Sequence, residues 1–446
     1  MHEKIIKYKE FTRMKFRTLL AIALIAGLGG VAFAELQNVE IGGSIRIRGN
    51  YFNMDSLGDD SFIEQRTRLN VKADFTQEVS AFIELDSYDI WGEDFRSWYL
   101  CGNDFRGEDN IDLYQAYIEA RNLWGSPLTA RVGRQELALG NQFLVGVKDV
   151  SAVFPGQSFD GLRLTFANDL VSIDAIAAKL AENYGDFGED DVDFYALYGS
   201  YIGIEDVTLD AYWMFVRDDE GVLANVLGGT TVDLHTVGLR GSGVIGGFDF
   251  ELEAAYQFGD VDDVPSACPL PFGNADVDFD EFAINAEVGY TFDASWQPRI
   301  FARFAYLGGG DPDYSLWSND YTMPFNRLFS NVEYSEFIDQ TALSNVMAYS
   351  IGLQALVTEA LEMKVVGSYY QVEQEYGNVG DDLGWEVGLY ADYNYSEDLV
   401  IRAGYAHFFG QDGLDAALIS DNGLNFWPGN SEDDYDYVFL ETEIAF

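Results

Sequence analysis

The sequence predicts an all-β protein, a transmembrane antiparallel up-and-down β-barrel of about 18 strands. Three observations predict this fold class. Apolar and polar residues alternate in repeated segments that are long enough to cross a membrane as tilted strands. The connections between the segments alternate between short and long. After the N-terminal leader, no apolar run approaches the length of a membrane-spanning helix, which excludes a helical membrane protein.

Alternation with a period of two runs along the whole chain. In FDFELEAAYQFGD, residues 248–260, every second side chain from Phe248 is apolar, and acids such as Asp249 and Glu251 lie between them. Because a strand turns successive side chains to opposite faces, this segment has one apolar and one polar face. About 18 such segments of roughly 10–14 residues occur, about twice the length of a typical strand of a water-soluble protein. They begin near residues 39, 62, 79, 111, 127, 158, 170, 191, 206, 232, 247, 277, 297, 345, 361, 382, 399 and 433.

The connections fall into two length classes. Short turns occur at 75–79, 122–127, 167–169, 203–206, 245–247, 293–297, 358–360 and 396–398, and long loops lie between them at 91–110, 138–157, 217–231, 260–276, 309–344 and 410–432. A sandwich of two sheets has no reason to separate its loops by length, whereas an outer-membrane barrel has short periplasmic turns and long extracellular loops. We therefore expect the apolar face of each strand to contact lipid and the long loops to be extracellular.

The first 34 residues have the features of a secretory signal peptide. Lys15 and Arg17 precede an apolar run, and the run ends in Ala32-Phe33-Ala34, a small-residue pattern typical of a cleavage site. We expect translation to start at Met14 and cleavage to follow Ala34, which leaves residues 35–446 as the barrel. The export machinery of a diderm bacterium would then deliver the chain to the cell outer membrane.

The expected mature chain is strongly acidic. The leader holds six of the 26 basic residues and two of the 75 acidic ones, so 20 basic and 73 acidic residues remain, a net charge of −53. A nucleic-acid partner is excluded because a basic surface is required for it. The acidic balance indicates either a solvated, mutually repelling surface or cations as partners. Cys101 and Cys268 lie in predicted loops, and whether they pair stays open.

Aromatic residues gather at the predicted strand ends, as in the interfacial girdles of membrane barrels. They are Tyr51, Phe52, Trp91, Trp124, Trp213, Phe215, Tyr290, Phe292, Tyr393, Tyr395, Phe408 and Phe409. The chain ends in the alternating strand YVFLETEIAF, and its terminal Phe446 resembles the signal that bacterial barrel-assembly machinery recognises. We expect outer-membrane lipid and this machinery as partners.

If the apolar phase of each strand faces outward, the other phase lines the lumen. The predicted pore-lining basic residues are Arg46, Arg48, Arg66, Arg68, Arg131, Arg163, Arg240, Arg299, Arg303 and Arg402. The predicted pore-lining acidic residues are Glu84, Asp86, Glu119, Asp210, Asp249, Glu251, Glu253, Glu287, Glu386 and Asp392. These walls either satisfy one another structurally or form a polar path that orients solutes and rejects apolar ones. Because the two sets nearly balance, most of the negative excess is expected in the loops.

Other kinds of site are weakly represented. The longest loop, 309–344, contains Phe325, Phe329 and Phe337 and is a candidate for a constriction or lid, with an ordinary extracellular loop as the alternative. The mature histidines, His235 and His407, lie on the outward phase and lack the neighbouring outward serine that outer-membrane lipases use. We expect no enzyme activity, no metal site and no cofactor.

Three stretches within residues 40–166 resemble the alginate-export family of outer-membrane barrels. They are QRTRLNVKADF, LYQAYIEARNLWGSPLTARVGRQELALGNQFLVG and FDGLRLTF. The resemblance implies an eighteen-stranded, monomeric barrel whose lumenal arginines conduct an acidic polysaccharide. The matching positions here are Arg66, Arg68, Arg131, Arg134, Asp160 and Arg163, although Arg134 shares the outward phase of Val132 unless a bulge intervenes. The mixed lumen and the acidic loops of this chain depart from a strongly cationic conduit.

Three functional hypotheses follow. The first is a porin-like channel for the diffusion of polar or charged solutes, favouring cations at its acidic mouth. The second is export or uptake of an acidic polysaccharide or saccharide along the arginine wall. The third is a structural surface barrel without conductance. The transported solute and the oligomeric state stay open.

Overall fold

The computed structural model describes residues 37–54, 58–92, 111–150, 152–182, 191–219, 231–265, 274–311, 320–339, 343–375, 380–411, 413 and 434–446. The predicted leader and the two cysteines, Cys101 and Cys268, lie outside the described residues. No helix in the described part of the chain is long and apolar enough to cross a membrane.

The described residues form nineteen strands and one short 3-10 helix, η2 (Leu123–Gly125). The strands are β1 (Asn38–Met54), β2 (Gly58–Asp74), β3 (Val79–Ile90), β4 (Asp112–Ala120), β5 (Leu128–Gln135), β6 (Phe159–Ala167), β7 (Val171–Ala181), β8 (Val192–Ile204), β9 (Val207–Asp218), β10 (Val232–Ile245), β11 (Phe248–Pro265), β12 (Asn274–Thr291), β13 (Arg299–Leu307), β14 (Asp320–Met323), β15 (Val346–Leu356), β16 (Leu361–Val372), β17 (Asp382–Asn394), β18 (Leu399–Gly410) and β19 (Tyr435–Ala445).

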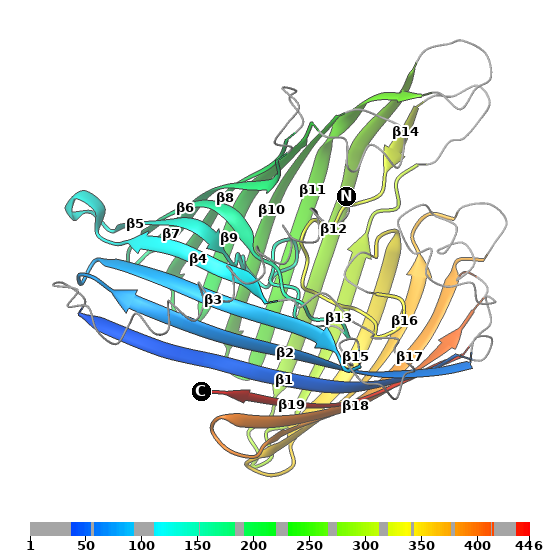
Figure 1. Cartoon of the computed structure of the whole chain (residues 1–446). Coiled ribbons are helices and arrows are strands. Elements are labelled where there is room, and N and C mark those ends of the chain that lie inside the picture. The colour runs from blue at the N-terminus through cyan, green and yellow to red at the C-terminus, as the bar shows by residue number, and fades with distance from the viewer. Residues whose placement is uncertain are drawn as a thin grey trace, which may run out of the picture.

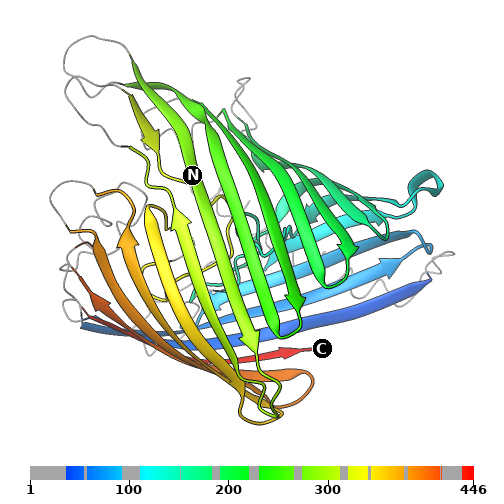
Figure 2. The same cartoon turned by 180° about the vertical axis from the view of Figure 1, so that it is seen from behind.

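The strands close into a barrel. Each wall strand pairs antiparallel with its neighbour in sequence, and β19 closes the ring by pairing with β1 (Figure 1). The short β14 is not part of the ring, because it pairs parallel with the end of β12 while β13 pairs directly with β15. Eighteen strands therefore form the wall, which confirms the predicted fold class; seen from behind, the same ring of tilted strands is continuous (Figure 2).

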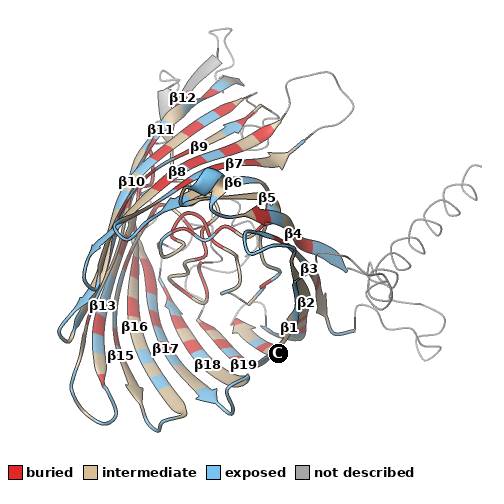
Figure 3. Cartoon of the chain, turned by 90° about the vertical axis from the view of Figure 1, so that its left-hand side faces the viewer, coloured by how far each residue is buried: buried red, intermediate tan, exposed pale blue. Residues whose placement is uncertain are grey.

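The period-two pattern explains the faces of this wall. In β11, Phe248, Leu252 and Phe258 are exposed on the outside, whereas Glu253 and Gln257 are buried on the inside. The same alternation of buried and exposed residues runs along the strands in Figure 3. Closure is needed in a membrane because hydrocarbon cannot satisfy the free backbone groups of an open sheet edge.

Two stretches of chain lie inside the ring of strands, where Figure 3 shows buried coil within the barrel. We call the described residues 136–150 and 152–157, between β5 and β6, the first inner segment, and residues 324–339, after β14, the second inner segment. They join each other: Phe329 donates its N–H to the Leu144 carbonyl at 2.8 Å, and Gly146 donates to the Phe329 carbonyl at 2.9 Å. The described part of the loop 309–344 thus supports the expected constriction more than an ordinary outer loop.

The inner segments complete an apolar core in the half of the barrel that carries the long connections. Phe329 packs edge-on against Phe159 and Phe194, and Phe143 stacks on Phe325 at 6.3 Å. Buried apolar side chains therefore occur on the inward phase of several strands. This corrects two expected girdle residues: Phe408 is buried inside against Phe337, and Phe52 packs inside against Tyr437.

Candidate functional site

The interior of the wall carries a network of ion pairs between neighbouring strands. Arg131 on β5 pairs with Glu119 on β4 at 2.6 Å, and Arg163 on β6 pairs with Asp174 on β7 at 2.8 Å. Arg240 on β10 contacts Asp210 on β9 at 2.5 Å. Because antiparallel strands place such side chains side by side, the pairing follows from the register.

The network continues around the ring with further predicted residues. Arg240 also pairs with Glu251, Arg299 pairs with Asp249 and with Glu287 at 2.6 Å, and Arg303 pairs with Glu287. Asp392 stands opposite Arg402 in the register of β17 and β18. These contacts explain why so many guanidinium groups can line one surface without strong mutual repulsion.

One carboxylate on the inward phase that the alternation predicts for the last strand holds three of the arginines. Glu441 on β19 accepts from Arg46 and Arg48 at 2.7 Å each and from Arg402 at 2.6 Å, and its side chain is fully buried. Glu441 lies on the inward phase of the last strand, so the alternation contains the signal for its position. Only the closure of β19 onto β1 brings it to Arg46 and Arg48.

Two predicted acidic residues, Glu253 and Glu386, contact neutral donors. Glu253 accepts from the Tyr212 hydroxyl at 2.7 Å. Glu386 accepts from the Ser335 hydroxyl at 2.7 Å and from the backbone N–H of Glu336 at 3.1 Å. Glu386 therefore anchors the second inner segment to β17 rather than facing an open path.

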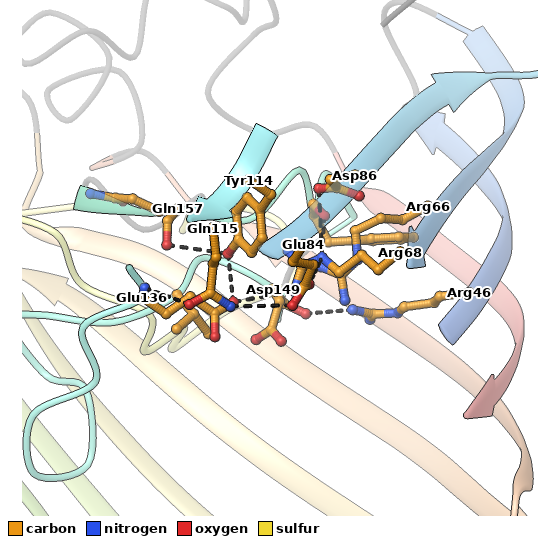
Figure 4. A network of polar contacts seen from close by, with 12 residues as sticks. Arg46, Arg66, Arg68, Glu84, Asp86, Tyr114, Gln115, Glu136, Asp149 and Gln157 are labelled. Carbon is orange, nitrogen blue, oxygen red and sulfur yellow. Dashed lines mark hydrogen bonds and ion pairs between the residues drawn. The ribbon is translucent and has the colours of Figure 1, made fainter. Parts of the chain in front are cut away.

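The first inner segment meets the wall at a basic cluster formed by Arg46, Arg66 and Arg68 (Figure 4). Arg68 contacts Glu136 at 3.2 Å, and both Glu84 and Asp86 at 3.5 Å. A bulge in the pairing of β3 with β4 turns the adjacent residues Tyr114 and Gln115 both inward. Tyr114 then donates to Glu136 at 2.6 Å, and Gln115 donates to Glu84 at 3.3 Å.

Arg66 differs from the other arginines of the wall. Its Nη1 donates to the Phe154 carbonyl at 3.0 Å, and in the described chain no carboxylate lies within 4 Å of it. Its Nε has no hydrogen-bond partner although the side chain is only 4% exposed. Arg68 also has two buried nitrogens without a hydrogen-bond partner, Nε and Nη2, but carboxylates lie 3.2–3.5 Å from its guanidinium group. Among the described residues, Arg66 is the cation of this cluster that combines an unused buried donor with the lack of a carboxylate partner, so it can accept an additional anionic partner.

Two positions implied by the family resemblance lie on the other face. Arg134 and Asp160 form an ion pair at 2.6 Å, and both side chains are about half exposed on the same outward phase as Val132. The bulge that would have turned Arg134 inward does not occur in the pairing of β5 with β6. These two residues therefore do not contribute to the interior network.

The two described histidines lie beside aromatic rings. His235 stacks on Phe215 at 4.3 Å, and His407 contacts Asp436 at 2.8 Å beside Phe409. Within the described residues, no group of three or more histidine, cysteine or acidic side chains is arranged to hold a metal ion.

The sequence also matches a protein-family model, described as alginate export, over residues 37–422. The chain belongs to the alginate export family. The match spans the wall from β1 to β18, which confirms the resemblance found in the first strands. No protein with curated information matches the sequence significantly.

Solved structures of outer-membrane porins share the fold of this alginate export family member. Pseudomonas aeruginosa OccK8 (OprE) aligns with a TM-score of 0.56 and 16% identity, over 91% of this chain and 98% of its own. P. aeruginosa OpdL aligns with a TM-score of 0.58 and 11% identity, over 92% and 99%. P. aeruginosa OccK2 (OpdF), solved in complex with glucuronate, aligns with a TM-score of 0.57 and 13% identity, over 92% and 99%. The protein is thus an outer-membrane, porin-like transport barrel.

Proposed function

We propose that this member of the alginate export family is a passive channel through which small polar or charged solutes cross the outer membrane, with a preference for cations. The observation that carries the proposal is the pairing of wall arginines with acids. Arg131, Arg163 and Arg240 each have a carboxylate at 2.5–2.8 Å. The transport role leaves no need for a catalytic site.

A paired arginine attracts an anionic solute less strongly than an unpaired arginine does. At an effective dielectric constant of about 20, two unit charges 4 Å apart interact by about 4 kcal/mol, and an adjacent opposite charge cancels most of that attraction for a second ion. A polyanion therefore gains little from a paired arginine wall. The acidic excess of the mature chain, 20 basic against 73 acidic residues, supports a negative potential that concentrates cations at the mouth.

The orientation and partners of the channel belong to the same proposal. The long connections face the cell exterior, the outer face contacts lipid, and Phe446 is read by the assembly machinery. Phe446 exchanges backbone hydrogen bonds with Gly43 on β1 at 2.9 and 3.0 Å and so completes the ring. This position of the last strand supports the role proposed for Phe446.

Reversal potentials across a planar bilayer under a salt gradient test the proposal. We expect a potential of the sign that cation selectivity produces, and we expect it to shrink at high ionic strength because salt screens the acidic surface. A potential of the opposite sign would overturn the cation preference.

A second candidate function is the passage of an acidic saccharide. Family membership, the glucuronate-bound OccK2 structure and the lack of a carboxylate partner at Arg66 among the described residues favour it. Oligouronates added to one side of the bilayer should then block single-channel current, and the lack of any block at millimolar concentration would count against this function.

A third candidate is a structural barrel without conductance. The close packing of the two inner segments favours it, since Phe143, Phe154 and Phe325 are almost completely buried inside the ring. Purified protein that inserts into bilayers but produces no current steps would support this candidate over both channel functions.

A further inference from the structure

We propose that the first inner segment acts as an internal ligand of the basic cluster, and that an anionic solute enters by displacing it. The inference rests on the second candidate function, the passage of an acidic saccharide through the channel, and concerns the regulation of the same interior. Its ligand class is a small carboxylate, because the groups that the segment covers are guanidinium donors.

Three contacts place the segment on the arginines. Arg46 donates from Nη1 to the Asp149 carbonyl at 2.6 Å, and Arg66 donates to the Phe154 carbonyl at 3.0 Å. The Phe154 ring lies beneath the guanidinium groups of Arg46, Arg48 and Arg66, at 3.9, 5.5 and 5.4 Å from its centroid. Phe154 is completely buried by these contacts.

The segment supplies the kinds of partner that an anionic solute would supply, in a weaker form. Two neutral carbonyl oxygens occupy donors that could bind carboxylate oxygens, and a carboxylate would add a full opposite charge and a bidentate geometry that a carbonyl cannot supply. The aromatic face adds a cation–π contact. Since Nε of Arg66 has no partner, a bidentate carboxylate can make one more hydrogen bond at Arg66 than the Phe154 carbonyl does.

The close fit of the segment depends on Gly156. Its φ is +85°, and a side chain there would place Cβ 2.2 Å from Nη2 of Arg68 and 2.7 Å from the Tyr114 hydroxyl. Glycine is therefore required for the chain to approach the cluster. On its other side the segment is held by Asn331, whose Oδ1 accepts from the Asp149 N–H at 2.9 Å.

Arginine modification measures the masking directly. The full mature chain, folded in detergent, is treated with phenylglyoxal, and the labelling rates of individual arginines are read by mass spectrometry. We expect Arg66, 4% exposed, to react much more slowly than Arg303, whose side chain is 43% exposed. Phe154→Ala should raise the rate at Arg66 by about tenfold through loss of the ring and its cation–π contacts, and should leave Arg303 unchanged.

Two variants separate masking from a general loosening of the interior. Phe337→Ala removes an equally buried ring of the second inner segment that packs on Phe408 and Tyr435, and it should leave the Arg66 rate unchanged. Phe154→Leu keeps the bulk but removes the π face; it should give an intermediate rate, and it also serves if Phe154→Ala does not fold.

Glucuronate block of single-channel current provides the second readout. Phe154→Ala should strengthen the block about tenfold relative to the native chain, and adding Arg66→Gln should abolish that gain. Equal labelling of Arg66 and Arg303 in the native chain, or no response of either readout to Phe154 substitution, would overturn the proposal while a conducting channel still stands. A barrel that never conducts would instead contradict the channel function. The labelling rates of Arg66 and Arg303 would then still show whether Phe154 masks Arg66.

Discussion

Glu441 is the residue on which the largest group of interior charges depends. Its side chain is fully buried between Arg46, Arg48 and Arg402. Removing one partner of a buried ion pair leaves an uncompensated charge and costs about 3–5 kcal/mol. We therefore expect Glu441→Gln to lower the free energy of unfolding by about 3 kcal/mol, measured by urea titration of the folded barrel in detergent.

The neighbouring Glu443 is the matched control, because it contacts Arg402 but is 29% exposed in its side chain. Exposed ion pairs contribute about 0–1 kcal/mol, so Glu443→Gln should change the unfolding free energy by less than about 1 kcal/mol. Equal effects of the two substitutions would contradict the interpretation of Glu441.

Glu119 tests the charge-pairing argument for ion preference. It accepts from Arg131 and Arg121, so Glu119→Gln leaves both guanidinium groups without this carboxylate. We expect the cation-to-anion permeability ratio to fall by roughly twofold, and Arg131→Gln to raise it, since each removes one sign of charge from the wall. Reversal potentials measure both, and a shift of the same sign in the two variants would refute the prediction.

The inner segments are the elements whose attachment controls the interior. Gln257 on β11 binds the backbone of Asn326 in both directions at 2.7 Å, donating to its carbonyl and accepting from its N–H. Gln257→Ala leaves these buried groups unsatisfied, at a cost of about 1–3 kcal/mol. We expect the second inner segment to detach more often, giving a higher mean conductance.

Gln371→Ala controls for the loss of an amide from the wall, because Gln371 donates to Asp382 on the neighbouring strand instead of to an inner segment. Its conductance should match that of the native chain. Limited proteolysis provides an independent check, since cleavage within residues 324–339 should accelerate only in the Gln257 variant.

Acidity should also affect this attachment. Burial raises the pKa of Glu336 in the second inner segment, and a hydrogen bond from Tyr390 opposes the shift; Glu386, Arg48 and Lys364 are its charged neighbours. The docked state therefore holds a proton more tightly than the released state. Docking is strongest below the ordinary glutamate pKa of about 4.3 and weakens as the pH rises through the raised value.

Conductance recorded between pH 4 and pH 8 tests this expectation. Mean conductance should increase with pH in the native chain, and Glu336→Gln, which remains uncharged throughout, should reduce the slope of that increase. An unchanged slope in the Glu336 variant would contradict the assignment.

At the scale of the whole molecule, the barrel depends on the close approach of β1, β2 and β19. A side chain at Gly43 would place Cβ 2.5 Å from the Arg68 carbonyl and 2.8 Å from the Phe446 ring, whereas at Gly49, on the same strand, the nearest atom is 3.9 Å away. We expect Gly43→Val to prevent closure and Gly49→Ala to be tolerated. A folded, closed barrel changes its electrophoretic mobility on heating, whereas an open chain does not. A Gly43→Val variant that still shows this mobility shift would disprove the expectation.

The sequence by itself determined the strands of the wall, their inward and outward faces and the family. Alternation is a property of adjacent residues, so the predicted segment starts agree closely with the observed ones, as at Val79, Val232 and Leu361. The four-residue β14 was not predicted, because a strand of that length is too short to show an alternating pattern of apolar and polar residues.

Only the tertiary structure decided which charges meet and what fills the interior. Glu441 is 395 residues from Arg46 in the sequence, and Asn331 is 182 residues from Asp149. A pattern among neighbouring residues therefore could not predict either contact. The inner segments lack periodicity, and their positions follow from apolar side chains that find partners only after the ring has closed. The masking of Arg66 by Phe154 thus depends on long-range packing inside the closed ring, whereas ion pairs such as Arg131–Glu119 need only the register of adjacent strands.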